Sequence, residues 1–398
     1  MIPRHEILEF ARVAGLQVHV IEKDYVLGWL LAGIGQSTRL LDAWVFKGGT
    51  CLKKCHFETY RFSEDLDFTL RDKTQLEPGF LMSAFSEVVE WVYENSGIEI
   101  LTDRMRFDRY LNPRGATSCQ GRVYYKGPAT YHGRQSMPRI KLDLSDDEIL
   151  VEDAVRTEVN HPYSDRPEPG IHVMAYSYAE IFAEKVRALA ERTRPRDLYD
   201  VIHFFRRPES RGVGGRVKSI LAKKCEFKGI SFPEIADLEK HKEACAVGWK
   251  EQLSHQLQAL PPFESCWSEL SHFFSWLENP EAFPFAVREA IPSPQGDWKE
   301  YGRMAGRESL ARGFESFRFA AFNRLCVEIF YTMENGDSSN SVVEPYSVRV
   351  IDGENLVLHA VETITGTVVW FPANRVTGIE VTLRTFEPRF EIDPVRWE

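Results

Sequence analysis

Apolar residues recur along the first third of the chain with spacings that alternate between helical and extended. Residues 4–36 repeat apolar positions every three or four residues, which predicts helix, and WVFK (44–47) predicts a short buried strand. We expect a helix at 50–55, a strand in RFSEDLDFTL (61–70) and an amphipathic helix that ends at Gly97. Between residues 98 and 159 strand patterns dominate, and MPRIKLDLS is the clearest of them.

The pattern is helical through the middle of the chain and extended at its end. SYAEIFAEKVRALAER predicts a helix, and Pro195 suits the first turn of the next one. Residues 214 to about 285 read as further helices, with one apolar stripe of Trp249, Leu253, Leu257 and Leu260. AIPSPQGDW (290–298) predicts a linker and is followed by helical residues to about 324. Short alternating strands separated by the turn signals ENGD, DGEN and TITG complete the chain.

Length and composition favour a globular protein of several domains. The chain has 398 residues, enough for two or three domains, and its 43% hydrophobic and 27% charged residues are typical of soluble proteins. A net charge of −10 disfavours a protein coated in nucleic acid but leaves room for a local basic cleft. The seven cysteines form no CxxC pair, no apolar signal core follows Met1, and WLLAGIG is too short to cross a bilayer. We therefore expect a cytoplasmic protein with no membrane partner.

The candidate chemistry is concentrated in VFKGGTCLKKCHFETYRFSEDLDFTL (45–70). On a strand, Asp65 and Asp67 point to one face, where two carboxylates repel each other unless a hard cation such as Mg²⁺ lies between them. The glycines of Gly48-Gly49-Thr50 let the backbone approach a phosphate at a helix start. Either motif alone is weak evidence for a site, since GG is often a plain turn and DxD is often a solvated strand end. Together they predict nucleotidyl or phosphoryl transfer.

Further charged residues could complete this site. Asp143 lies in an alternating apolar strand, where it is either a third metal ligand and base or a solvated strand end. Lys185 could offset the charge of a triphosphate, although an isolated helix lysine is usually solvated. Asp197 and Asp200 share one helix face and are either catalytic or part of a surface salt-bridge cluster.

Four segments together resemble the AbiEii/AbiGii-type nucleotidyltransferase toxins, which belong to the DNA polymerase β-like superfamily. They are IEKDYVLGWLL, FKGGTCLKKCHFETYRFSEDLDFTL, IKLDLS and AEKVRALAERTRPRDLYDVIHF, within residues 5–285. The resemblance implies an α+β transferase core with a mixed sheet and an active enzyme that uses an NTP with Mg²⁺ or Mn²⁺. It assigns the metal to Asp65 and Asp67, with Asp143 as the loosest match. It makes Lys185 the triphosphate contact, and Asp200, ahead of Asp197, the final acidic residue. We expect these residues to bind the nucleotide: Lys47, Gly48, Gly49, Thr50, Ser63 and Lys185.

The end of the chain is similar to WYL-type domains, which are small Sm-like β-barrels thought to bind nucleotides or nucleic-acid fragments. The Trp-Tyr-Leu tripeptide itself is replaced by Leu356-Val357-Leu358. Arg375 matches the most regular arginine of that family, and the predicted ligand pocket adds Tyr346, Arg349 and His359. The expected domains are a core (1–210), a helical bundle (211–289), a linker with helices (290–324) and a small barrel (325–398).

Two classes of function follow, with a third in reserve. The first is a toxin or anti-phage effector that transfers NMP from an NTP to a tRNA 3′ end, another RNA or a protein hydroxyl, gated by the C-terminal domain and controlled by an antitoxin. Self-modification at Ser63, Thr50 or Thr69 is a variant of it. The second is a WYL-type sensor of a nucleic-acid or nucleotide signal, in which the transferase fold is a scaffold. The third is a nucleotide hydrolase or kinase that uses the same carboxylates.

Overall fold

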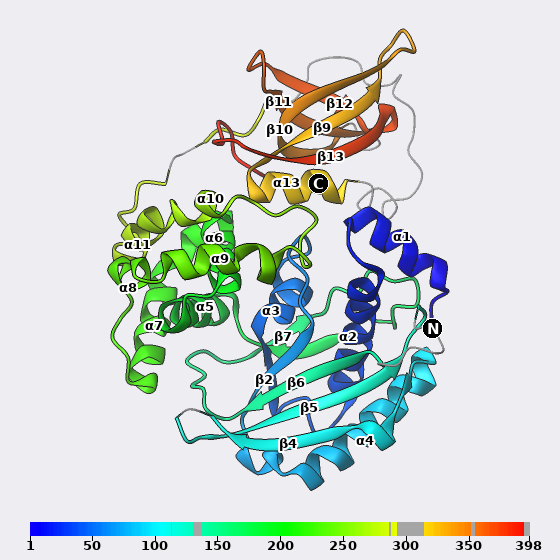
Figure 1. Cartoon of the computed structure of the whole chain (residues 1–398), viewed down its shortest axis with the longest axis vertical. Coiled ribbons are helices and arrows are strands. Elements are labelled where there is room, and N and C mark those ends of the chain that lie inside the picture. The colour runs from blue at the N-terminus through cyan, green and yellow to red at the C-terminus, as the bar shows by residue number, and fades with distance from the viewer. Residues whose placement is uncertain (113, 130–136, 286–287, 293–313, 352–354, 394–398) are drawn as a thin grey trace. The chain divides into compact units, whose positions relative to one another are not determined.

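The structure is a computed structural model that describes every residue except 113, 130–136, 286–287, 293–313, 352–354 and 394–398. The chain forms two compact units (Figure 1). The first unit contains Met1–Arg192 and Val213–Asp237, and the second contains Thr193–Gly212 and Leu238–Glu398. Residues 211–289, expected to form a helical bundle, contribute to both units, and the predicted domain boundaries stay predictions.

The first unit begins with the two helices that the sequence pattern predicts over residues 4–36. They are separate because Gly15, with φ 63°, ends the first of them in the left-handed region that glycine tolerates. The α-helices are α1 (Arg4–Ala14), α2 (Val18–Gln36), α3 (Gly48–Cys51), α4 (Pro78–Ser96), α5 (Tyr178–Arg192) and α7 (Gly214–Lys228). The short helices are the π-helical η1 (Leu52–His56) and the 3₁₀ turns η2 (Lys73–Leu76) and η3 (Thr102–Arg104). As predicted, α4 ends at Gly97.

A mixed sheet lies at the centre of the first unit. Its described strands are β1 (Trp44–Lys47), β2 (Asp65–Leu70), β3 (Glu99–Ile100), β4 (Arg106–Leu111), β5 (Thr117–Lys126), β6 (Arg139–Ser145), β7 (Val155–Glu158) and β8 (His172–Ala175). They follow the order β3-β5-β6-β2-β1-β8-β7, with β4 paired to β5. The β2–β6 and β1–β8 pairs are parallel and the others antiparallel, which confirms the predicted mixed sheet.

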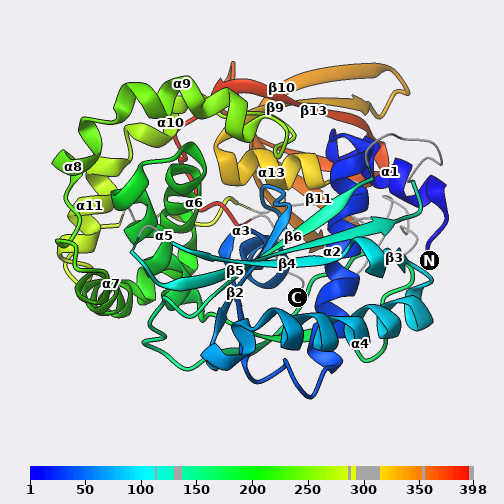
Figure 2. The ribbon, with the colours of Figure 1, turned by 60° about the horizontal axis from the view of Figure 1, so that its bottom comes forward.

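Helices cover this sheet through close apolar contacts. A Cβ on Gly33 of α2 would lie 3.0 Å from Val88 of α4, so the missing side chain lets the two helices approach closely. Figure 2 shows α4 alongside the strands, where its Phe85 ring packs edge-on against Phe107 of β4.

A buried ion pair of 2.6 Å between Lys54 of η1 and Asp24 ties the turn after the glycine motif to α2. Breaking such a pair would leave an uncompensated buried charge.

The second unit starts with helices. They are α6 (Pro195–Arg206), the 3₁₀ turn η4 (Pro208–Gly212), α8 (Ile235–Glu239, which spans the boundary between the units), α9 (Lys242–Leu253), α10 (Phe263–Trp267), α11 (Leu270–Glu278) and α13 (Glu315–Asn323). Pro195 is at the first turn of α6, as predicted. The predicted stripe on a single helix is wrong beyond Leu253: a turn closed by the Gln256 N–H and the Leu253 carbonyl ends α9, so Leu257 and Leu260 lie outside it.

The last part of the second unit is a five-stranded antiparallel sheet in the order β12-β11-β10-β9-β13. Its described strands are β9 (Leu325–Thr332), β10 (Ser338–Ile351), β11 (Asn355–Glu362), β12 (Val368–Pro372) and β13 (Val376–Thr385), with the 3₁₀ turn η6 (Ala373–Arg375). The turns predicted at ENGD and TITG are present, with left-handed glycines at 336 and 366. Most of DGEN and of the linker and helical stretch at 293–313 lies outside the described residues.

This sheet curves, and α13 packs against it (Figure 1). The ring centroids of Tyr331 on β9 and Phe371 on β12 are 5.0 Å apart. In the sheet order two other strands lie between β9 and β12, so only a curved sheet can bring these rings together. The structure shows the sheet without barrel closure, which remains a prediction. Within the described part of the chain, we find no helix with the length and apolar character needed to cross a membrane.

Candidate active site

The pairing of β2 with its two neighbours brings three predicted site residues into one row. Lys47 of β1 is the cross-strand partner of Asp67, and Asp67 is in turn the partner of Asp143 on the parallel strand β6. Directly opposed residues point to the same face of a sheet. The register therefore places Asp143 beside Asp67, with Asp65 two residues along the same face. This position agrees with the first of the two interpretations of Asp143 given above, the one in which it faces the other carboxylates.

Gly48 shapes the space next to Asp67. Its φ of 78° is in the left-handed region, and a Cβ there would lie 2.1 Å from Oδ2 of Asp67. Any other residue would be strained and would also displace the carboxylate. The glycine is thus required by the close approach of the backbone to Asp67, whereas the approach to a phosphate, predicted from the sequence, stays a prediction.

The next two residues of the motif support the turn around the site. A Cβ on Gly49 would meet Ser63 Oγ at 2.9 Å, so the start of α3 lies directly against the segment that leads into β2. Thr50 is buried, and its hydroxyl donates a hydrogen bond to the backbone carbonyl of Asp65. The hydroxyl of Thr50 therefore holds the two motifs together.

The three carboxylates strongly affect one another. Burial, followed by the negative charge of Asp143, raises the pKa of Asp67 to about 7, although Lys47 and Lys185 counteract this rise. Burial and the charge of Asp143 also raise the pKa of Asp65, against the effect of Lys141. Like charges held this close favour protonation or the binding of a cation.

Lys47 joins this group to a buried cluster of charges on α5 and α7. Its Nζ lies 3.7 Å from Glu184 of α5. Burial lowers the Lys47 pKa, but Glu184, Glu148 and Asp67 outweigh burial and leave the pKa raised. Although burial alone would raise the pKa of Glu184, the nearby Lys47, Lys224 and other cations lower it to about 2. Both Lys47 and Glu184 are therefore charged at neutral pH.

Three further predicted residues lie on helices: Lys185 on α5, and Asp197 and Asp200 on α6. Lys185 is largely buried on α5, next to Glu184, and its charge acts on Asp67. Asp197 and Asp200 are buried on α6, which belongs to the second unit. Their catalytic role stays a prediction.

Two residues of the site were not identified from the sequence. Gln120 of β5 donates a hydrogen bond of 3.2 Å to Oδ1 of Asp143, and its partner across the strands is Asp143 itself. Glu184 pairs with Lys47. Alternation in TSCQGRVYYK shows which residues share a face, but only the pairing of β5 with β6 shows that Gln120 meets Asp143. Glu184, directly before Lys185, could have been found as a carboxylate on the same helix.

The carboxylates suit a divalent cation completed by a substrate. In this structure, no group of three or more His, Cys, Asp or Glu side chains among the described residues is arranged to hold a metal ion. Asp65 and Asp67, whose pKa values are both raised, are nevertheless a suitable donor set, because Mg²⁺ usually takes one or two carboxylates together with water and substrate phosphates. The cradle at Gly48 keeps Oδ2 of Asp67 uncovered by a neighbouring side chain.

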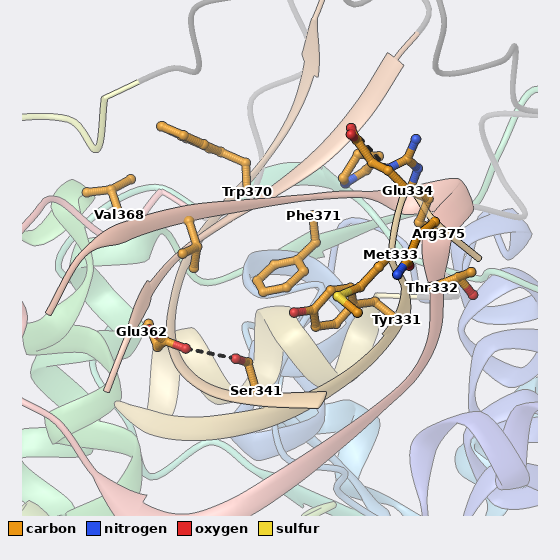
Figure 3. A pocket seen from close by; sticks show the side chains of 13 residues that line it. Tyr331, Thr332, Met333, Glu334, Ser341, Glu362, Val368, Trp370, Phe371 and Arg375 are labelled. Carbon is orange, nitrogen blue, oxygen red and sulfur yellow. Dashed lines mark hydrogen bonds and ion pairs between the residues drawn. The ribbon is translucent and has the colours of Figure 1, made fainter. Parts of the chain in front are cut away.

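A separate cavity of about 610 Å³ lies in the curved sheet of the second unit. Tyr331 and Phe371 point toward each other inside it, Trp370 lies at its rim, and Ser341 donates a hydrogen bond to Glu362 (Figure 3). The guanidinium of Arg375 lies 3.5 Å from Glu334. The volume is in the range of small-molecule sites.

Of the four residues predicted for the C-terminal pocket, only Arg375 lines this cavity. Tyr346 is fully buried in the hydrophobic cluster with Cys326 and Val361, where its hydroxyl donates to Glu344. His359 is also fully buried, and burial together with Arg349 lowers its pKa to about 4. Tyr346 and His359 therefore contribute to the core, whereas the cavity wall is formed by aromatic residues that the sequence analysis did not select.

One family profile and two solved structures are similar to this chain. The profile of the family described as "Nucleotidyl transferase AbiEii toxin, Type IV TA system" matches residues 29–315. Among solved structures, the nucleotidyltransferase toxin MenT4 of Mycobacterium tuberculosis H37Rv is 19% identical, with a TM-score of 0.44, over 70% of this chain and 90% of that chain. Proteasome accessory factor B/C of Arthrobacter aurescens is 12% identical, with a TM-score of 0.19, over 92% and 70%. Comparison with curated proteins gives no match.

The raised pKa of Asp67 predicts a pH-dependent effect of Asp67→Asn on stability. A carboxyl whose pKa is higher in the folded state (about 7) than in the unfolded state (about 3.8) favours folding at acid pH and loses this effect as the pH rises through 7. In the presence of a chelator, Asp67→Asn should therefore stabilise the protein by about 1–3 kcal/mol at pH 8 relative to its effect at pH 4. Urea unfolding at both pH values measures this.

The matched control is Asp103→Asn, which changes an exposed carboxylate on η3. Its effect on stability should be the same at both pH values. A difference for Asp67→Asn that is no larger than that of the control would contradict the electrostatic account of the site.

Proposed function

Because the chain belongs to the AbiEii nucleotidyltransferase toxin family of type IV toxin–antitoxin systems, we propose that Asp65, Asp67 and Asp143 form its active site and transfer NMP from an NTP to a hydroxyl group. The family makes the chain a nucleotidyltransferase and implies an NTP substrate and an antitoxin partner. We place the reaction in the cytoplasm, where NTPs and tRNA are available.

One observation carries this assignment: Asp67 is directly opposite Asp143 on one side and Lys47 on the other, next to the backbone of Gly48. A salt-bridge cluster would pair each carboxylate with a cation. Here two carboxylates are neighbours, and the pKa of Asp67 is raised to about 7 by burial and Asp143. Perturbed groups of this kind are typical of functional sites.

The side chains divide the work according to their surroundings. Asp143, oriented by its hydrogen bond from Gln120, accepts the proton of the attacking hydroxyl. Lys47 and Lys185 offset negative charge on the triphosphate as pyrophosphate leaves, and the glycine motif lets the phosphates approach the backbone. Glu184 positions Lys47 before the nucleotide binds. A catalytic role for Asp200, or for Asp197 in its place, remains an expectation from the family resemblance.

Asp65 and Asp67 would hold Mg²⁺ or Mn²⁺ together with water and substrate phosphates, with Asp143 beside Asp67. Such a cation, when bound, neutralises phosphate charge and lowers the pKa of a coordinated hydroxyl. The protein's own contribution is to keep the carboxylates close together and partly buried. Their negative charge is then only partly compensated until the cation and the NTP bind.

For the acceptor we propose the 3′ end of tRNA first and a protein hydroxyl second. The structure separates the three hydroxyls considered for self-modification. Thr50 is buried and donates to Asp65, and Thr69 is buried against the Tyr176 hydroxyl at 2.7 Å. Ser63 is only partly buried and lies against Gly49. If the protein modifies itself within this group, Ser63 is the expected residue.

The decisive experiment for the transferase is label transfer. Purified protein is incubated with Mg²⁺, each α-labelled NTP in turn and total bacterial RNA. We expect a labelled tRNA band with the wild type, and a decrease of about a hundredfold or more with Asp67→Asn or Asp143→Asn because the base or the cation site is lost. Asp103→Asn serves as the matched control and should transfer normally.

The products distinguish the alternatives. Label on the protein instead of RNA would select the second acceptor, and Ser63→Ala then tests the self-modification site. Release of phosphate or ADP without transfer would indicate a hydrolase or kinase. Undiminished transfer by Asp67→Asn would refute the assignment of the site.

The cavity in the second unit supports a second role, the binding of a small signal that gates the transferase. Its aromatic walls suit a flat nucleobase, since each ring offers a face or edge for stacking. In the part of the lining that the structure describes, Arg375 is the single basic residue, beside Glu334 and Glu362. This charge balance favours a nucleoside or mononucleotide over a long polyanion.

Phe371→Ala tests this role, because it removes one of the facing rings. We expect nucleotide binding, followed by calorimetry, to weaken about tenfold, in line with the loss of one stacking partner. Any effect of that nucleotide on label transfer should weaken in parallel. Leu383→Ala, an exposed apolar residue on β13, is the control. Wild-type affinity in Phe371→Ala would contradict a ligand in this cavity.

A further inference from the structure

Four arginines meet in a small cleft of the second unit, far along the sequence from the transferase motifs. The cleft, called the arginine cleft here, has a volume of about 40 Å³. Arg206 comes from the end of α6, Arg211 from η4, Arg288 from the described residues 288–292, and Arg324 from the position that follows α13. Its opposite wall is the C-terminal segment 388–392, called the tail here.

The carboxylates around the cleft do not balance these four cations. Glu269 is shared by two guanidinium groups, at 2.7 Å from Arg206 and 2.8 Å from Arg324. Glu391 pairs with Arg211 at 3.1 Å. Glu387 contributes to the field at Arg324. Among the residues that the structure describes, these three carboxylates face the four arginines of the cleft, which leaves one positive charge over.

Arg288 carries the clearest unmatched charge. Its Nε donates to the backbone carbonyl of Pro388 at 2.6 Å, which leaves the charge itself uncompensated. Within the described residues no carboxylate pairs with its guanidinium. A half-buried arginine that contacts only a neutral carbonyl retains donors for an anion.

Arg324 supplies a second, independent indication. It is not a glycine, yet its φ of 54° is in the left-handed region at the C-terminal end of α13. This conformation is strained for an arginine, and helix ends of this kind usually carry glycine. Burial and the charge of Arg206 lower the Arg324 pKa to about 10, so the site also destabilises its own charged form. An anion next to the guanidinium would stabilise this charged form.

We propose that the arginine cleft binds one phosphate group, as free phosphate or as the terminal phosphate of a mononucleotide. The four guanidinium groups come from separate elements and line one small cleft, an arrangement that suits a tetrahedral oxyanion better than a planar carboxylate. The volume has room for one such group and excludes a nucleobase, which would have to remain outside. The cleft is distinct from the transferase carboxylates and from the aromatic cavity of the curved sheet.

Occupation of this site would join the helical part of the second unit to its tail. Arg206 and Arg211 belong to the α6–η4 segment, whereas the tail is held by Arg288 and by a backbone hydrogen bond from Glu391 to Glu289. A phosphate between them adds charge-assisted hydrogen bonds to both sides. Phosphate should therefore stabilise the protein as it binds.

Calorimetric titration of the full chain at constant ionic strength, with inorganic phosphate in a chloride buffer, tests the proposal. We expect saturable binding to the wild type, weakened about tenfold or more in Arg288→Gln and in Arg324→Gln, because each removes a charge-assisted hydrogen bond. Arg384→Gln changes an exposed arginine on β13 outside the cleft and should bind phosphate normally. AMP should show the same dependence on Arg288 if nucleotides use the cleft, and adenosine should not bind there.

Folding is checked by thermal unfolding in chloride alone. Arg324→Gln loses the contact with Glu269 and can lower stability for that reason, so Arg288→Gln, which loses only the bond to Pro388, is the deciding variant. Absence of saturable phosphate binding to the folded wild type would overturn the proposal. So would unchanged phosphate affinity in Arg288→Gln.

Discussion

The register of β2 between β1 and β6 determines the chemistry of the first unit. Asp67 faces Asp143 only because Leu66 and Phe68, which alternate with it, are fully buried on the other face of the sheet. A slip by one residue would expose this apolar face and place a hydrophobic side chain beside Asp143. The hydrophobic effect thus holds two mutually repelling carboxylates together. No polar interaction within the site needs to do so.

The same constraint explains the positions of the surrounding charges. Because the position of Asp67 is fixed, the backbone at residue 48 lies so close to its carboxylate that only glycine fits there. The register also places Lys47 of β1 directly across from Asp67. Lys47 is itself paired with Glu184 of α5, so the sheet and the helix are coupled electrostatically at the site. The arginine cleft of the second unit has the opposite imbalance, an excess of positive charge. In both places the fold holds like charges close together, an arrangement suited to a ligand of the other sign.

Much of this could be predicted from the sequence where local rules decide. Periodicity gave the helices and strands around the motifs, and Gly97 and Pro195 marked helix boundaries through their backbone preferences. The pair of GGT and DLD motifs could be recognised in the sequence because it depends only on one turn and one nearby strand. Contacts between distant strands were not readable, which is why Gln120 was missed and why two interpretations of Asp143 stayed open. The burial of Tyr346 and His359 could not be foreseen for the same reason. Both side chains have suitable chemistry for a ligand pocket, but the pleat of the sheet turns them into the core. The arginines of the cleft are spread over more than a hundred residues of sequence and show no motif.

Carboxyl NMR on protein labelled with ¹³C at aspartate tests the central claim most directly. The Asp67 resonance, assigned with Asp67→Asn, is followed as a function of pH with and without Mg²⁺ and an NTP analogue that cannot be cleaved. The account predicts a pKa near 7 without the cation, because of burial and Asp143, and a value well below neutrality when cation and nucleotide are bound. An ordinary aspartate pKa that neither Mg²⁺ nor nucleotide changes would contradict it.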